Sequence, residues 1–315
     1  MNETMRAISP RTWGDPDVLT LIETPRPVPG PTEILVRVHA AGVNPTDWKS
    51  RRYGGLGLWN DPVILGYDVS GVVEAVGVGV TLFRPGDEVF GMPRFPHQAG
   101  AYAEFVTGPA RHFAPKPAAL DHVRAAALPL AGLTALQALT EAAALRAGQR
   151  VLIHAAAGGV GHLAVQIAAS LGVHVTGTAS AAKHPLLRAL GADELIDYRT
   201  TDFTTAVRDV DAVLDTVGGD YATRSLRVLR PGGTLVTLTS PDDVPPAGPG
   251  SAGLRTGFTI VEPDHAGLRT LTELVASRRL RVEIDTVLPL EQAAKAHELS
   301  ESGRATGKIV LRVAE

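Results

Sequence analysis

The most informative absence in this sequence of 315 residues is cysteine, of which the chain has none. Without cysteine the chain has no disulfides, thiolate nucleophiles, iron–sulfur clusters or cysteine-ligated zinc. Such a composition suits a reducing compartment, and we expect a cytoplasmic protein.

Long hydrophobic runs and clusters of one charge are also missing. The most apolar stretch, residues 125–139, is interrupted by Pro129 and Gly132 and is shorter than the roughly 20 residues that span a bilayer. The N-terminal segment "MNETMRAISP" lacks an export-signal pattern. The 30 basic residues are dispersed and the net charge is −3. We therefore expect no membrane and no nucleic-acid partner, but a small molecule or another protein chain.

The chain is long enough for two domains, and its residue pattern changes near Arg124. Before it, short β-rich pieces separated by Gly and Pro predict an irregular barrel or sandwich without a long helix. After it, apolar strands alternate with Ala- and Leu-rich helices, which predicts a doubly wound parallel sheet. We place strands at 151–155, 173–179, 194–198, 211–216 and 234–239, helices at 159–171 and 181–190, and an irregular loop at 240–253.

The segment "IHAAAGGVGHLAVQIA" (153–168) reads as strand, bare turn and helix. Ala156, Gly158 and Gly161 form an A-x-G-x-x-G pattern, a variant of the dinucleotide fingerprint. The missing side chains let a pyrophosphate approach the backbone at the positive end of a helix. A plain tight turn is the alternative, but the order of strand, turn and helix, with further βα units after it, favours dinucleotide binding.

The end of the second strand indicates which dinucleotide is bound. An acidic residue about 20 positions after the glycines would hold a ribose 2′-hydroxyl, but "VTGTASAAK" (175–183) contains none. Thr178 and Ser180 offer hydroxyls and Lys183 a positive charge, a set that suits a 2′-phosphate. The sequence therefore favours NADPH, although Lys183 has the alternative of a solvated helix residue.

Several separated motifs resemble one family, the zinc-independent medium-chain dehydrogenase/reductases, in its quinone oxidoreductase branch. The resemblance covers nearly the whole chain. Its motifs are "AAGVNPTDWKSR" (40–51), "LGYDVSGVVEAVGVGVTLFRPGDEVFG" (65–91), "GAYAEFV" (100–106), "AAAGGVG" (155–161), "GADELIDYRTTDF" (191–203), "VLDTVGG" (213–219) and "GRATGKIVLRV" (303–313).

This resemblance implies an α/β protein with a GroES-like β-rich catalytic domain (1–124, completed by 264–315) and a Rossmann NADP-binding domain (125–263). It implies a cleft between them for nicotinamide and substrate, and a homodimer. The expected cofactor-binding positions are Ala156, Gly158, Gly159, Val160 and Gly161 in the turn, Thr178, Ser180 and Lys183 after the second strand, and Tyr198, Val217 and Arg304. Tyr198 has the alternative of a strand-end aromatic that covers the core.

Zinc-dependent relatives have a cysteine where this chain has Asn44, and a His-Glu pair where it has Tyr67 and Asp68. We therefore expect no metal. The matching reaction is hydride transfer from NADPH to a quinone or a conjugated enone or enal, with the negative charge on the acceptor oxygen stabilised by the protein.

Three residues of "GVNPTDWKSRRYGG" are candidates for catalysis. Asn44 can donate its amide to a ligand or be a turn residue before Pro45. Lys49 can stabilise an enolate or quinol oxygen, and Tyr53 can donate a proton or act as a lid; for both the alternative is solvated surface. Asp47 reads as structural, a helix N-cap or a partner for an arginine.

Two other functions stay open. One is an enoyl or enone reductase that tailors a biosynthetic intermediate, because a lysine stands at position 49 where the type quinone reductase carries a tyrosine. The other, of a different class, is a non-enzymatic NADPH-binding structural or regulatory protein.

Overall fold

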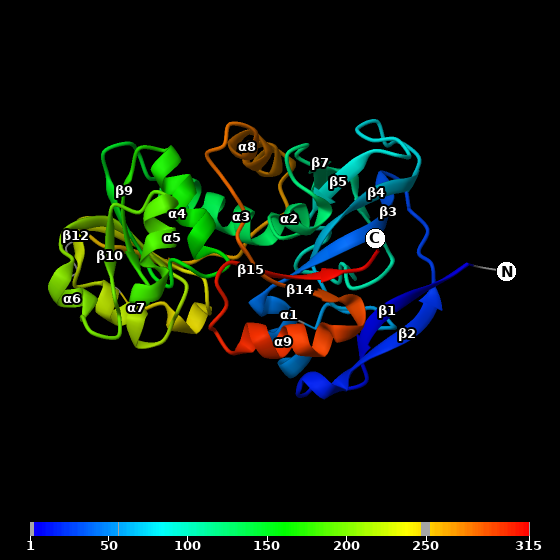
Figure 1. The fold of residues 1–315 in the computed structure, drawn as a ribbon, viewed down its shortest axis with the longest axis horizontal. Helices are drawn as coiled ribbons and strands as arrows, with labels where there is room; N and C mark the ends of the chain where they lie inside the picture. Colours follow the sequence, from blue (N-terminus) through cyan, green and yellow to red (C-terminus); the bar gives the residue numbers. More distant parts are fainter. Residues whose placement is uncertain (1–2, 56, 247–252, 315) are drawn as a thin grey trace. The chain divides into compact units, whose positions relative to one another are not determined.

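The computed structural model describes residues 3–55, 57–246 and 253–314. The chain forms two compact units (Figure 1). Unit 1 comprises Met1–Leu133, Glu262–Arg278 and Val282–Glu315, and unit 2 comprises Thr134–Val261 with Arg279–Arg281. The α/β class with one β-rich unit is confirmed. The helix α3 (Pro129–Gln137) straddles the first boundary, so the predicted domain limits at 124 and 263 stay predictions.

Unit 1 is built on a mixed sheet whose described strands run in the order β14-β15-β3-β4-β5-β7, with β6 paired to β3. The antiparallel pair of β15 and β3 brings a C-terminal strand beside an N-terminal one, as Figure 1 shows by its red and blue arrows. Both ends of the chain therefore contribute to this unit. Its strands are β1 (Thr4–Pro10), β2 (Leu19–Pro25), β3 (Glu33–Val43), β4 (Asp68–Val76), β5 (Glu88–Gly91), β6 (Phe105–Pro109), β7 (Phe113–Pro115), β14 (Ile284–Pro289) and β15 (Lys308–Arg312).

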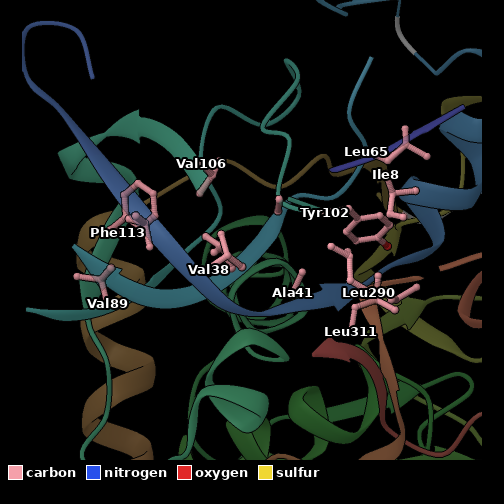
Figure 2. Packing of buried hydrophobic residues seen from close by; sticks show 14 of the residues in the cluster. Ile8, Val38, Ala41, Leu65, Val89, Tyr102, Val106, Phe113, Leu290 and Leu311 are labelled. Carbon is pink, nitrogen blue, oxygen red and sulfur yellow. The ribbon is translucent and has the colours of Figure 1, made fainter. Parts of the chain in front are cut away.

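Alternating apolar side chains of these strands form the core of unit 1. Figure 2 shows Tyr102 close to Ile8, Leu290 and Leu311, with its ring in the apolar cluster. A phenol buried so deeply needs a polar partner for its hydroxyl. The helices of the unit are α1 (Pro45–Tyr53), α2 (His122–Ala126), α8 (His265–Ala276) and α9 (Ala293–Glu301), with 3-10 turns at Pro16–Val18, Ala110–His112 and Leu290–Gln292.

Unit 2 contains a parallel sheet with the described strand order β10-β9-β8-β11-β12-β13. Counted along the chain from β8, this order is 3-2-1-4-5-6, the arrangement of dinucleotide-binding Rossmann domains. The predicted doubly wound sheet is thus confirmed. Its strands are β8 (Arg150–Ile153), β9 (His174–Thr178), β10 (Glu194–Ile196), β11 (Val210–Asp215), β12 (Leu229–Thr237) and β13 (Arg255–Phe258).

Short helices connect these strands, and each predicted strand lies within a few residues of an observed one. The described part of the 240–253 loop holds a 3-10 turn, Pro241–Asp243, while residues 247–252 lie outside the described residues. Among the described helices, none combines the length and apolar character that crossing a membrane requires. The helices of unit 2 are α4 (Gly161–Ser170), α5 (His184–Ala189), α6 (Phe203–Ala206) and α7 (Asp220–Ser225), with a π-helical turn at Ala138–Ala142 and a 3-10 turn at Ala181–Lys183.

Candidate active site and dinucleotide turn

The glycine turn lies where the strand order of unit 2 changes direction, between β8 and β11. Ligands of open α/β sheets bind at this switch point, outside the carboxyl ends of the strands. The turn is tight: Ala155 has a left-handed φ of +45°, and its carbonyl oxygen accepts the Gly158 N–H at 2.9 Å. A Cβ at position 161 would lie 2.4 Å from the same oxygen. Glycine is therefore required where α4 begins.

Ala156 occupies the first position of the pattern because the second strand passes close behind it. Its side chain is buried, its N–H donates to the Thr178 carbonyl at 3.0 Å, and a Cβ at position 177 would lie 2.9 Å from the Ala156 Cβ. Alanine fits this space, while a larger side chain would push the turn off the sheet. The small residues thus fix the position of the turn on β9.

Thr178, expected at the 2′-phosphate, lies with its hydroxyl against the glycine turn. Its side chain is buried, and its hydroxyl oxygen lies 3.2 Å from the Ala155 N–H and 3.3 Å from Nδ1 of His154. A hydroxyl engaged on the inner side of the turn does not offer itself to a 2′-phosphate. Thr178 supports the turn from behind instead.

The segment after β9 keeps Ser180 and Lys183 together in one short turn, in which the Lys183 N–H donates to the Ser180 carbonyl at 2.9 Å. A carboxylate that the sequence pattern does not single out lies beside this turn. Asp197 accepts the Ala181 N–H at 3.1 Å, and backbone N–H donors, that of Arg199 first, lower its pKa. An ionised acid therefore lies beside the turn that carries Lys183.

The other predicted cofactor residues follow neighbouring strands. Tyr198 comes after β10 and is about half exposed, 48%, while Val217 comes after β11 and is 44% exposed. The Val217 N–H donates to Asp215 at 2.9 Å, which fixes the backbone there. The carboxyl ends of β8, β9, β10 and β11 thus gather most of the predicted set at one edge of unit 2. Arg304 belongs to unit 1 and precedes β15.

In unit 1, Asn44 directly precedes helix α1, and its amide is held on both sides. Its Nδ2 donates to Asp68 at 2.8 Å, and its Oδ1 accepts from the Lys308 ammonium. Lys308 also donates to the Val43 carbonyl at 3.1 Å and lies 3.7 Å from the Asp68 carboxylate. All three side chains are buried. Sequence reasoning did not identify Lys308 as a partner of Asn44. The only signal for its burial is the apolar sequence around it, "GKIVL".

Burial opposes both charges of this pair. It raises the pKa of Asp68 and lowers the pKa of Lys308, while their mutual attraction acts against both shifts. Asp68 accepts a further bond from the Leu130 N–H at 2.7 Å. The positions that the resemblance matches to zinc ligands, Asn44 and Asp68, therefore contain a neutral amide and a carboxylate already paired with an ammonium, and this donor set does not fit Zn²⁺.

A second buried polar side chain, that of Asp47, lies in the first turn of α1. Asp47 accepts the Asn44 N–H at 2.7 Å and the Tyr102 hydroxyl at 3.1 Å, so the phenol finds its partner here. His297 Nε2 lies 3.3 Å from the same hydroxyl. Burial raises the pKa of Asp47 to about 7. Asp47 is structural as expected, but it occupies the third helical position rather than the N-cap, which is Asn44.

Lys49 and Tyr53 do not join Asn44 in one cluster. Tyr53 ends α1 and is 71% exposed, whereas Asn44 precedes the helix and is buried. Tyr53 lies nine positions after Asn44, about 13 Å along the axis. Lys49 lies between them, half-buried, with its ammonium 5.9 Å from the centre of the Trp48 ring. The three candidates therefore do not form a single catalytic group.

Several solved structures have a fold similar to that of this chain. A quinone oxidoreductase from Coxiella burnetii is 39% identical, with a TM-score of 0.90 over 99% of this chain and 100% of that chain. An NAD-dependent alcohol dehydrogenase is 34% identical, with a TM-score of 0.89 over 98% and 100%. A mycobacterial protein solved with NADPH is 33% identical, with a TM-score of 0.85 over 98% and 100%.

Relatives of known name are similar along most of this chain. A mitochondrial NAD(P)H oxidoreductase of Homo sapiens is 34% identical, covering 90% of this chain and 82% of its own length. A 2-methylene-furan-3-one reductase of Solanum lycopersicum is 35% identical, covering 98% and 79%. The pikromycin polyketide synthase component PikAII of Streptomyces venezuelae is 35% identical over 96% of this chain, which spans only 8% of that much longer protein.

A GroES-like unit joined to a Rossmann unit with a glycine turn defines a class of dinucleotide-dependent oxidoreductases. Residues 30–118 match the alcohol dehydrogenase GroES-like domain, and residues 190–311 match the zinc-binding dehydrogenase family. The chain belongs to the medium-chain dehydrogenase/reductase family and is an NAD(P)H-dependent oxidoreductase of that family.

Proposed function

We propose that the protein transfers hydride from NADPH to a quinone or a conjugated enone or enal without a metal. The observation that carries this proposal is the glycine turn at the switch point of the unit 2 sheet, followed by a second strand whose end carries a lysine and no acid. Hydride donation is the chemistry that the nicotinamide supplies when bound.

The residues of unit 2 suit the cofactor. Gly158 presents backbone without a side chain, with only the Ala155 oxygen, among the described residues, near its absent Cβ, and Gly161 lets the turn close on the Ala155 oxygen. The start of α4 next to them favours an anion. We assign the pyrophosphate to the turn Ala156–Gly161, with Gly159 and Val160 in its middle. Val217 is proposed to flank the cofactor after β11.

The preference for NADPH rests on charge. Lys183 and Arg199 bring two positive charges to the segments after β9 and β10. Of the two acids there, Asp197 accepts the Ala181 N–H, and Asp202 is paired with Arg224 at 2.8 Å. With Asp202 paired to Arg224, the charges that remain favour a 2′-phosphate over a 2′-hydroxyl. Ser180 and Tyr198 complete the proposed phosphate site. Arg304 stays a prediction from the resemblance, and Thr178 leaves the set because its hydroxyl supports the turn.

The proposal of a metal-free reaction rests on Lys308. A divalent cation bound at Asn44 and Asp68 would compete with an ammonium 3.7 Å from the same carboxylate. The charge that develops on the acceptor oxygen needs hydrogen-bond donors instead. We propose the second Nδ2 hydrogen of Asn44 as one such donor. The ammonium of Lys49, which lies further along α1, stays a separate candidate from the sequence. Tyr53 is no longer included, because it lies at the exposed end of α1.

The names of the relatives favour two acceptor classes, quinones and the conjugated carbonyl of 2-methylene-furan-3-one. Reduction of a conjugated carbonyl also suits a tailoring step in biosynthesis, the alternative that the similarity to a polyketide synthase component supports. A homodimer stays a prediction from the resemblance.

The test is a titration of the purified protein with NADPH and NADH, followed by loss of nicotinamide absorbance with a panel of quinones, enals and enones. Lys183→Ala should weaken NADPH binding about tenfold and leave NADH binding nearly unchanged. Arg188→Ala, which removes an exposed cation from the neighbouring helix α5, is the matched control and should change neither. Equal losses for both cofactors would remove Lys183 from the phosphate site. Binding without oxidation across the panel would favour the non-enzymatic alternative.

A further inference from the structure

His154 is a buried histidine that the proposed reaction does not use. It follows β8 and directly precedes the strained Ala155 of the glycine turn. Its ring is fully buried and lies edge-on to two aromatic rings, with centroids 4.6 Å from Phe203 and 5.1 Å from Tyr221. Both ring nitrogens have polar partners.

The hydrogen-bond partners determine which nitrogen of His154 carries the proton. Ser225 Oγ lies 2.7 Å from the Tyr221 carbonyl oxygen, which can only accept, so the single hydroxyl proton of Ser225 goes there. Ser225 Oγ must then accept from His154 Nε2, 2.9 Å away. His154 is therefore protonated at Nε2, and in the neutral ring Nδ1 is left as an acceptor.

Thr178 extends this chain of hydrogen bonds to the glycine turn. Thr178 Oγ1 lies 3.3 Å from His154 Nδ1 and donates its proton to that nitrogen. Its lone pair then accepts the Ala155 N–H at 3.2 Å. The hydrogen bonds run in one direction, from Ala155 through Thr178, His154 and Ser225 to the Tyr221 carbonyl.

We propose that this relay makes His154 a positioning residue for cofactor binding: its neutral Nε2–H form, through Thr178, holds Ala155 in the left-handed conformation that shapes the phosphate-binding turn. The inference rests on the proposed dinucleotide function and deepens it. It also gives Thr178 a role opposite to the one its sequence position predicts, because it serves the pyrophosphate turn and not the 2′-phosphate.

Two features support the relay. Ala155 has φ +45° without being glycine, a conformation that persists only where the surroundings stabilise it. Its carbonyl oxygen is the atom that a Cβ at Gly158 or Gly161 would meet, so a change of φ at Ala155 would move that oxygen within the turn. Burial, together with the positive charge of Arg224, lowers the pKa of His154 to about 3, which keeps the ring neutral at physiological pH.

Binding constants for NADPH and NADH separate the relay from a direct phosphate contact. Thr178→Val and His154→Phe keep the volume and remove the hydrogen bonds; each should weaken both cofactors by the same factor, about tenfold. Thr178→Ser should restore binding to within about threefold of the wild type, because it keeps the hydroxyl. Thr176→Val is the matched control: this buried threonine of the same strand bonds Glu194, not the turn, and binding should be unchanged.

Loss confined to NADPH would overturn the inference, as would unchanged affinity in Thr178→Val. If Thr178→Val fails to fold, Ser225→Ala serves instead: it removes the hydroxyl that accepts from His154 Nε2 and should weaken the binding of both cofactors equally. Nitrogen-15 NMR of His154 in the wild-type protein gives an independent reading, and a proton on Nδ1 would refute the relay. If the wild type bound neither cofactor, the proposed function would fail, while the NMR result would still decide the hydrogen-bond order.

Discussion

Replacing Lys308 by methionine is the strongest perturbation that the structure suggests for unit 1. The variant keeps the length of the side chain and removes the ammonium from a fully buried setting. It leaves Asp68 with two bonds, from Asn44 at 2.8 Å and the Leu130 N–H at 2.7 Å, but without a positive charge.

The magnitude follows from the distance between the charges. At an effective dielectric constant of about 20, unit charges 3.7 Å apart attract by about 4 kcal/mol. Removing one partner of a buried pair costs about 3 to 5 kcal/mol, since the other charge stays unpaired. We expect Lys308→Met to lower the free energy of unfolding of unit 1 by about 3 kcal/mol. The double variant with Asp68→Asn should lose at least about 2 kcal/mol less than the sum of the single losses.

Tryptophan fluorescence during urea unfolding is the suitable assay. The three tryptophans of the chain, Trp13, Trp48 and Trp59, all lie in unit 1, so the signal reports on the unit that contains Lys308. Lys295→Met is the control: this exposed lysine pairs with Glu298 at 2.9 Å, and its loss should change stability by less than about 1 kcal/mol. A Lys308→Met variant as stable as this control, or additive losses in the double variant, would refute the reasoning.

Three further predictions concern the pH dependence, the turn and helix α1. Burial, together with the charge of Arg51, lowers the pKa of His297 to about 3 from 6.5; the unfolded chain therefore binds a proton that the folded one does not. Stability should fall as the pH drops from 6.5 toward 3, by up to about 1.4 kcal/mol per pH unit, and His297→Gln should remove this part of the slope in urea titrations followed by fluorescence. Gly161→Ala should weaken NADPH binding at least about tenfold, because its Cβ would lie 2.4 Å from the Ala155 oxygen; Gly257→Ala, with open space around it, should bind normally, and equal affinities would contradict the tight turn. Tyr53→Phe should leave NADPH oxidation within about twofold of the wild type, because its hydroxyl is at the exposed end of α1; a large loss would return Tyr53 to the catalytic set.

Local sequence patterns predict the Rossmann unit well, because its signals are short-range. The run from β8 through the turn to α4 combines a strand, small residues and helical spacing within about 20 positions. The partners of Asn44 could not be predicted in the same way. Lys308 is 264 positions away, and only the pairing of β15 with β3 brings it there. The threonine at the end of β9 shows the same limit, since its hydroxyl is visible in the sequence but the face to which it turns is not.

The orientation of the Asn44 amide follows from the charges on its two sides. Lys308 can only donate and Asp68, when ionised, can only accept. A flip of the amide would place its NH₂ against the ammonium and its oxygen against the carboxylate, so only one orientation satisfies both neighbours. The ion pair therefore costs stability through desolvation but fixes the orientation of the amide, which leaves its second Nδ2 hydrogen for the ligand that we propose. A neutral pair at positions 68 and 308 would be expected to relieve the desolvation and to lose the preference for one orientation. The buried charges of Asp68 and Lys308 thus serve to orient Asn44 more than to stabilise unit 1.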